Sequence, residues 1–195
     1  MQTILVTLSG VIYIIASTSY AISIMRGRTK PHRMTRFLLL SIIGLNFFSV
    51  VALHGNLGAL VFSGIAFIQA IVIFFLSLWR GMGGTTRSDW ICLVITGVGI
   101  VGWKTTGNPI IGILFAILAD FVAYLPAFIK TWHHPDTESP WFYVLGSFVL
   151  LLGLAAYKIE IASFYQIYAL LASLVMVGFI YKKNIHRFIK HQRNK

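Results

Sequence analysis

Apolar residues occur along this chain in seven long runs, each bounded by a short polar or charged segment. Most runs approach the ~17–25 residues that a helix needs to cross the hydrocarbon core of a bilayer. The fourth run is short at 14 residues, but Asp89 before it can cap a helix and Lys104 after it can reach the membrane surface. The pattern predicts an all-α integral membrane protein with seven transmembrane helices, at Ile4–Met25, Phe37–Leu53, Leu57–Trp79, Trp90–Trp103, Pro109–Ile129, Trp141–Tyr157 and Ile161–Tyr181.

Composition supports a membrane protein. Hydrophobic residues make up 57% of the 195 residues and charged residues 11%, against about 45–50% and 25% in soluble domains. The formal charge of +11 alone would suggest a nucleic-acid partner. The basic residues instead lie in short segments beside the apolar runs, as the positive-inside rule requires of a membrane protein. We therefore expect no nucleic acid to bind.

The basic residues also predict an orientation. If the first, third and fifth loops and the C-terminal tail are cytoplasmic, that side holds 14 of the 16 Lys and Arg, and only Lys104 and Lys158 lie outside. This arrangement places the N-terminus outside and the C-terminus in the cytoplasm. The short loops and the first run, which is too long for the apolar region of a signal peptide, favour a bacterial inner membrane. The basic tail is expected to contact anionic lipid.

The chain resembles itself after a shift of 104 residues, which places the first three runs on the last three. Tyr20 then falls on Tyr124, and the basic turn that ends at Pro31 falls on the one that ends at Pro135. Because the fourth run reverses the chain once more, the two groups of three helices run in the same direction. We expect a first repeat over 1–80, a linker helix with its loops over 81–107, a second repeat over 108–183 and a basic tail over 184–195. Parallel repeats of this kind place a solute site between the halves, near mid-membrane.

This order of three, one and three helices resembles the SWEET/PQ-loop superfamily of small transporters, and the likeness covers nearly the whole chain. Leu125-Pro126-Ala127 keeps a proline at a place comparable with that of the family, whereas the family's Pro-Gln motif is absent and the first run has Ala21-Ile22. The resemblance implies alternating access, in which two halves rock against each other around a central solute.

Asp120 is the only acidic residue inside an apolar run, about midway along the fifth. Because a charge at mid-membrane costs about 2.5–3.5 kcal/mol, its side chain should face the bundle interior or water. One interpretation is a carboxylate that binds solute or couples transport to protons. The other is a structural hydrogen bond from a neighbouring helix, with Tyr13 and Asn46 as candidate donors. Tyr124 lies four residues further on, hence on the same helical face.

Asn46 and Gln69 are the other clear polar candidates at depth. An amide offers both donors and acceptors, as recognition of a polar solute requires, but it can equally bond across helices. Pro126 removes a backbone hydrogen bond and is a candidate hinge, although prolines are also tolerated in membrane helices. Tyr165, Gln166 and Tyr168 in the seventh run present the same two interpretations, and for them we favour hydrogen bonds across helices over solute recognition. We expect His54 and Asn56 to be merely solvated.

These features favour a transporter of a small polar solute, with Asp120 as the candidate proton-coupling group and Tyr124, Asn46 and Gln69 as solute ligands. A receptor or sorting protein on the same scaffold is the alternative, and homo-oligomer formation stays open. No cofactor or metal is expected, because the His133–Glu138 segment matches no zinc spacing. An enzyme is disfavoured because the runs contain no nucleophile–base set, and a retinal protein because the seventh run has no lysine.

Overall fold

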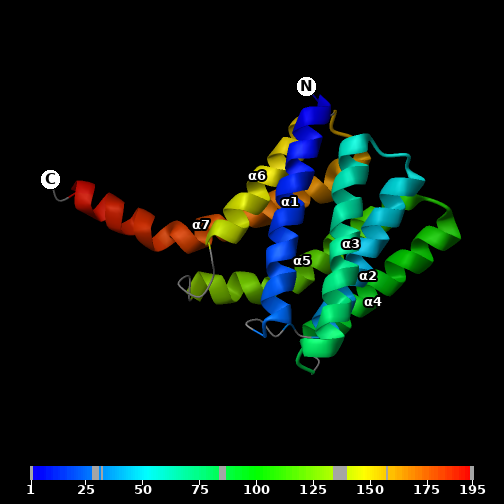
Figure 1. Cartoon of the computed structure of the whole chain (residues 1–195), viewed down its shortest axis with the longest axis horizontal. Helices are drawn as coiled ribbons and strands as arrows, with labels where there is room; N and C mark the ends of the chain where they lie inside the picture. Colours follow the sequence, from blue (N-terminus) through cyan, green and yellow to red (C-terminus); the bar gives the residue numbers. More distant parts are fainter. Residues whose placement is uncertain are drawn as a thin grey trace.

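The computed structural model describes residues 2–27, 31, 33–83, 87–133, 140–156 and 158–193, without the side chains of residues 3, 23, 130, 140–142 and 183–193. These residues form seven α-helices and one short 3-10 helix (Figure 1), and no strand occurs within these ranges. The expectation of an all-α fold is therefore confirmed. The helices are α1 (Gln2–Met25), α2 (Arg33–Ala52), α3 (Leu57–Arg80), α4 (Arg87–Thr106), α5 (Pro109–His133), α6 (Pro140–Ala156), η2 (Ile161–Ser163) and α7 (Phe164–Arg193).

Five stretches within the described helices are long and apolar enough to cross a membrane: Ile4–Ile22, Arg33–Ala52, Leu57–Arg80, Pro109–His133 and Ile161–Lys182. The apolar part of α6, Tyr143–Ala156, is shorter, and α4 is not among the five. The protein is thus an all-α membrane protein.

The distribution of side chains is the reverse of that in a water-soluble protein. Large apolar side chains face outward, and Ile68, Phe75 and Val94 are each 63% exposed. Ser49 and Ser77, by contrast, are fully buried. A buried serine satisfies its hydroxyl within its own helix, as when Ser49 Oγ donates to the Leu45 carbonyl at 2.7 Å. Lipid is the solvent that suits such a surface.

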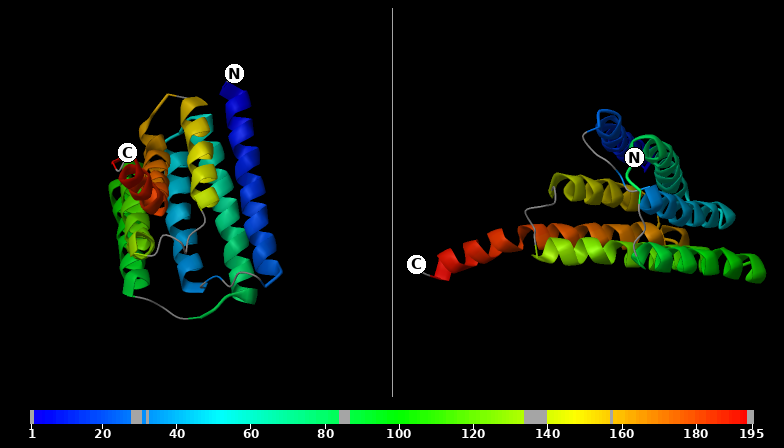
Figure 2. Two further views of the ribbon diagram at one scale, coloured as in Figure 1. Left: turned by 90° about the vertical axis from the view of Figure 1, so that its left-hand side faces the viewer. Right: turned by 90° about the horizontal axis from the view of Figure 1, so that it is seen from below.

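The helices fall into two groups with the same packing order (Figure 2). In the first group, α3 packs against both α1 and α2; in the second group, α7 packs against both α5 and α6. The groups meet where α1 packs on α6 and α2 packs on α5, while α4 packs on α5 and α2. Helices α5, α6 and α7 each begin 107 residues after α1, α2 and α3 respectively. The C-terminal part of α7 projects beyond the bundle in Figure 1.

Glycines allow close approach between helices at two of these contacts. A Cβ added at Gly112 of α5 would lie 2.1 Å from Ser49 Oγ of α2, and one at Gly99 of α4 would lie 2.5 Å from Phe115 Cβ of α5. Gly97 on α4 has no such neighbour within 4 Å. Small residues at these positions let backbones approach, which is how membrane helices gain packing energy.

Two expectations about helix ends were wrong. Because α4 begins at Arg87, Asp89 lies within the first turn and does not cap the helix; it is buried and accepts a hydrogen bond from Thr35 Oγ1 at 3.4 Å. Asn56 is not merely solvated, since its Oδ1 accepts from the Ala59 N–H at 3.0 Å and its Nδ2 donates to the Lys158 carbonyl at 3.1 Å. Asn56 therefore caps α3 and ties the first group to the second.

Some expectations concern parts of the chain without a description. The paired basic turns that end at Pro31 and Pro135 lie partly outside the described residues, and the side chains of residues 183–195 in the basic tail are not described. The helices that flank those turns begin 107 residues apart, so their register differs by three residues from the 104-residue shift of the sequence.

Candidate functional site

Asp120 lies in the interior of the bundle, at the twelfth position of the 25-residue helix α5, and is 5% exposed. Its carboxyl group interacts with the side-chain hydroxyls of Tyr165 and Tyr168, near the start of α7. The two tyrosines are three residues apart and share one face of the helix. The partners suggested by the sequence, Tyr13 and Asn46, are not those that the structure brings to the carboxyl group.

The Tyr168 hydroxyl is buried and forms no hydrogen bond of normal geometry with any described residue, although it faces Asp120. Tyr165 packs beside it with ring centroids 5.8 Å apart. Both tyrosines thus interact across helices, with Asp120 of α5, in agreement with the interpretation that the sequence favoured. No sequence signal identified Asp120 as their partner, because an apolar helix does not show which of its faces is buried.

Tyr124 connects this cluster to the first group of helices. It lies one turn beyond Asp120 on α5, as its spacing indicated, and is close enough to interact electrostatically with Asp120, Tyr143, Tyr13 and Arg36. These four residues come from α5, α6, α1 and α2. Tyr124 thus lies within electrostatic range of polar side chains from both groups.

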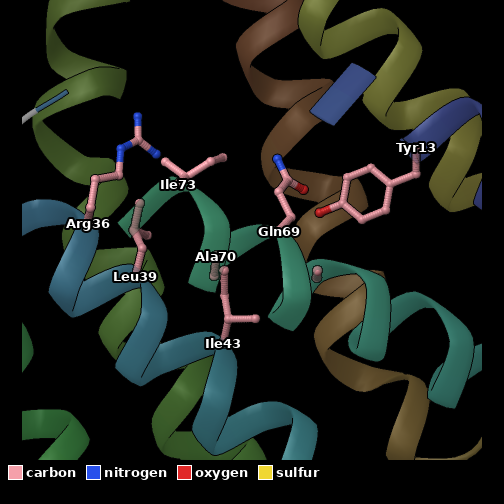
Figure 3. A pocket seen from close by; sticks show the side chains of 8 residues that line it. Tyr13, Arg36, Leu39, Ile43, Gln69, Ala70 and Ile73 are labelled. Atoms are coloured by element: carbon pink, nitrogen blue, oxygen red, sulfur yellow. The ribbon is translucent and has the colours of Figure 1, made fainter. Parts of the chain in front are cut away.

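A cavity of about 90 Å³ opens beside this point, within the first group. Its lining comes from α1, α2 and α3 and consists of Tyr13, Arg36, Leu39, Ile43, Ala66, Gln69, Ala70 and Ile73. Figure 3 shows the Tyr13 hydroxyl directed toward the Gln69 amide at one side of the cavity, and the Arg36 guanidinium beside Ile73 at the other. The cavity thus has polar groups at two ends and an apolar wall between them.

Gln69 and Asn46 both have hydrogen-bonding capacity that the described residues leave unused. Gln69 lines the cavity, and its Oε1 is buried without a hydrogen-bond partner. Asn46 is 3% exposed, and its Oδ1 also lacks a partner. It lies on the face of α2 that carries Leu39 and Ile43, but it is not part of the cavity lining. A buried polar atom without a partner costs about 1–3 kcal/mol, which a polar solute could recover.

Arg36 is a site residue that the sequence did not single out. Its guanidinium donates a hydrogen bond to the Tyr20 hydroxyl and lies 5.1 Å from the centre of that ring. Within the described parts of the chain, no carboxylate lies at ion-pair distance from it. As the last of five basic residues between Arg26 and Arg36, it was interpreted as part of the positive-inside flank. It lies on one face of α2 with Leu39 and Ile43, and all three residues line the cavity.

Pro126 lies inside α5, six residues beyond Asp120, and its side chain is exposed. The helix continues through it from Pro109 to His133. Pro126 is not part of the cavity lining, and any role as a hinge would act through the backbone of α5.

The described residues contain no group of three or more His, Cys, Asp or Glu side chains that could hold a metal ion. Comparison of the chain with protein-family models, with curated proteins and with solved structures finds no match. Function is therefore inferred from the side chains described above.

Proposed function

We propose that this protein is a carrier that moves a small polar solute across a membrane by alternating access. The observation that carries this proposal is the interior polar cluster, which joins side chains of both helix groups around Tyr124, beside a cavity. Ionisable groups at depth in a membrane protein are costly and mark solute or proton pathways by default. The interior polar cluster comprises Tyr13, Arg36, Gln69, Asp120, Tyr124, Tyr165 and Tyr168.

The proposed architecture is a seven-span bundle of two parallel repeats, 1–80 and 108–183, with α4 as the linker. The helix contacts support it. The packing order within the first group recurs in the second. The contacts between the groups are also equivalent, because the first helix of each group packs on the second helix of the other: α1 on α6, and α5 on α2. Helix α4 has 20 residues, and at 1.5 Å per residue it extends about 30 Å, the thickness of a hydrocarbon core. This architecture is the one that the SWEET/PQ-loop resemblance implies.

In the proposed orientation the N-terminus lies outside and the C-terminus lies in the cytoplasm of a bacterial inner membrane. The end of the bundle where α1, α3 and α5 terminate is then cytoplasmic. The ends of α3 and α5 carry Trp79 and Trp132, each beneath a cation: Arg80 lies 4.4 Å from the Trp79 ring centre and Lys182 lies 3.3 Å from that of Trp132. Aromatic rings beside basic groups are typical of a membrane interface.

Within the carrier, Asp120 is the proposed coupling residue and Gln69 and Asn46 are proposed solute ligands. Tyr165 and Tyr168 of α7 interact with the carboxyl group through their hydroxyls. A change in the protonation of Asp120 would therefore alter its interactions with α7. Because α5 also contacts α2, the same change reaches the interface between the groups. Rocking of the groups at the α1–α6 and α2–α5 contacts is the proposed alternating-access motion.

Uptake into sealed proteoliposomes tests this proposal. Sugars, amino acids, nucleosides, vitamins and small organic acids are offered with and without an inward proton gradient, to the wild type and to Asp120→Asn. We expect uptake of a solute that follows the gradient and falls by at least about tenfold in Asp120→Asn, because the amide cannot exchange a proton. Glu160→Gln makes the same chemical change at an exposed position before η2 and is expected to leave uptake unchanged.

Binding without flux would contradict the carrier. If a solute raises the melting temperature of the protein but no solute enters the liposomes, the protein is a receptor or sorting protein on the same scaffold. Uptake that depends neither on the proton gradient nor on the Asp120→Asn substitution would support the carrier function and exclude Asp120 from its mechanism.

A further inference from the structure

We infer that the solute is a small carboxylic acid, bound as its anion by Arg36 in the cavity of the first helix group. The transport of this acid rests on the proposed function, whereas its binding can be measured independently of flux.

The charge of Arg36 is the first step. A guanidinium stays protonated in any protein environment and presents five N–H donors in a planar fork that matches a carboxylate. In the described structure its hydrogen-bond partner is the neutral Tyr20 hydroxyl, and no carboxylate neutralises it. A partly buried cation on a cavity wall with donors to spare is a binding site for an anion, and a carboxylate can occupy the fork with two parallel hydrogen bonds.

The rest of the lining selects an organic anion over an inorganic one. Beyond Arg36 the wall is apolar, formed by Leu39, Ile43, Ala66, Ala70 and Ile73. An inorganic anion would have to desolvate against these side chains without compensation. A carboxylic acid places its alkyl body there. A sugar would leave several hydroxyls unpaired at the same wall, so it is the poorer occupant.

The far side of the cavity allows one more polar group. Gln69 Oε1 is buried without a partner, and the Tyr13 hydroxyl points toward the same place (Figure 3). A hydroxyl on the second or third carbon of the acid could donate to Gln69. Arg36 is the one cationic side chain among the described residues of the lining, so the cavity offers a single carboxylate partner. This favours a monocarboxylate.

The volume limits the length of the acid. The cavity measures about 90 Å³, which is smaller than the roughly 150 Å³ apolar cavity that accommodates benzene. Acids of about two to four carbons fit within this limit. Longer fatty acids and nucleotides do not fit the cavity in this conformation.

Binding is tested on the purified full-length chain in lipid nanodiscs. The melting temperature is measured with sodium propionate, with propionamide and with sodium chloride at equal ionic strength. Propionamide has nearly the same shape as propionate and no charge. We expect propionate, but neither propionamide nor chloride, to raise the melting temperature in a saturable way.

The matched variants are Arg36→Gln and Arg33→Gln, which remove the same charge from the same helix. Arg33 is exposed, and its structural contact is a backbone N–H bond to the Met82 carbonyl, which the substitution keeps. We expect Arg36→Gln to weaken propionate binding by about tenfold or more, as loss of a charge-assisted hydrogen bond requires, and Arg33→Gln to leave it unchanged. Equal shifts from propionate and propionamide, or unchanged binding in Arg36→Gln, would overturn the inference.

A second variant covers the case in which Arg36→Gln does not fold. Ala70→Leu keeps the charge and fills the cavity from α3, so it is expected to abolish the propionate shift. If a folded Ala70→Leu protein still binds propionate, the cavity is not the binding site and the inference is overturned. Propionate binding without uptake would support the acid site and contradict the carrier. Uptake of a neutral solute without propionate binding would support the carrier and overturn the acid site.

Discussion

The two helix groups share a packing order but carry different chemistry. Counted from the first residue of their helices, Tyr13 of α1 and Asp120 of α5 both occupy the twelfth position, yet one is a phenol and the other a carboxylic acid. The first group supplies the cation and the cavity, through Arg36 and Gln69. The second group supplies the acid and the tyrosine hydroxyls that face it. Two groups with the same packing order thus carry unlike side chains, and both the acid and the cation lie within electrostatic range of Tyr124.

The comparison depends on α4, which packs on α2 of the first group and on α5 of the second, and Gly99 is the residue at which this packing can be disrupted. A Cβ there would lie 2.5 Å from Phe115 Cβ of α5 and 3.0 Å from Leu45 Cδ2 of α2. We expect Gly99→Ala to lower the free energy of unfolding by about 1–3 kcal/mol, because neither group can retreat without disturbing the other. Reversible unfolding in mixed detergent micelles measures this change.

Gly97→Ala is the matched control for that experiment, since the same substitution two residues earlier meets nothing within 4 Å. Better helix propensity should leave its stability unchanged or raised by up to about 1 kcal/mol. Equal effects of the two substitutions would contradict close packing of α4 against both groups.

Substitution of Tyr168 tests the role of the second group, and we expect it to change stability less than Gly99→Ala does. Its hydroxyl is buried without a hydrogen-bond partner of normal geometry. We therefore expect Tyr168→Phe to change the free energy of unfolding by no more than about 0.5 kcal/mol. Solute uptake should nevertheless fall several-fold, because the hydroxyl faces the carboxyl group of Asp120. Uptake and unfolding are measured on the same preparation.

Tyr181→Phe provides the control on the same helix, at a side chain that is 38% exposed, and should alter neither quantity. A loss of more than 1 kcal/mol in Tyr168→Phe with normal uptake would assign Tyr168 to structure and not to transport.

Hydropathy was sufficient to predict the helices because lipid requires long apolar segments and leaves little room for other folds. Each of the seven predicted runs coincides with a helix of the structure. The interior position of Asp120 could also be predicted, since a carboxylic acid inside an apolar run is too costly to face lipid. The extent of α4 was underestimated, because its ends at Arg87 and Thr106 are polar and lie outside the apolar run.

The partners of Asp120 and the role of Arg36 could not be predicted in the same way. An apolar helix has no polar stripe to reveal which face is buried, so Tyr165 and Tyr168 could not be assigned to the face opposite α5. Arg36 stands at a helix end, where a basic residue is expected for topological reasons alone. The bond from Asn56 to Lys158 spans 102 residues, a distance over which sequence pattern carries no information on contact.

The central claim, that the two groups move against each other around the site, is tested most directly by distances between spin labels. Cys92 is the only cysteine, and Cys92→Ser retains a donor for the Ala119 carbonyl that Cys92 Sγ contacts at 3.3 Å. One labelled pair joins the groups, at Met25 of α1 and Ile129 of α5; the other lies within the first group, at Met25 and Leu78 of α3. All three positions are at least 46% exposed.

Pulsed electron paramagnetic resonance in nanodiscs then measures the distance distribution of each labelled pair, with and without the solute that the uptake screen identifies. The account predicts two populated distances for the pair between the groups, with proportions that change when solute is added, and one unchanged distance for the pair within the first group. A single distance for both pairs, unaffected by any transported or bound solute, would contradict alternating access between these two groups of helices.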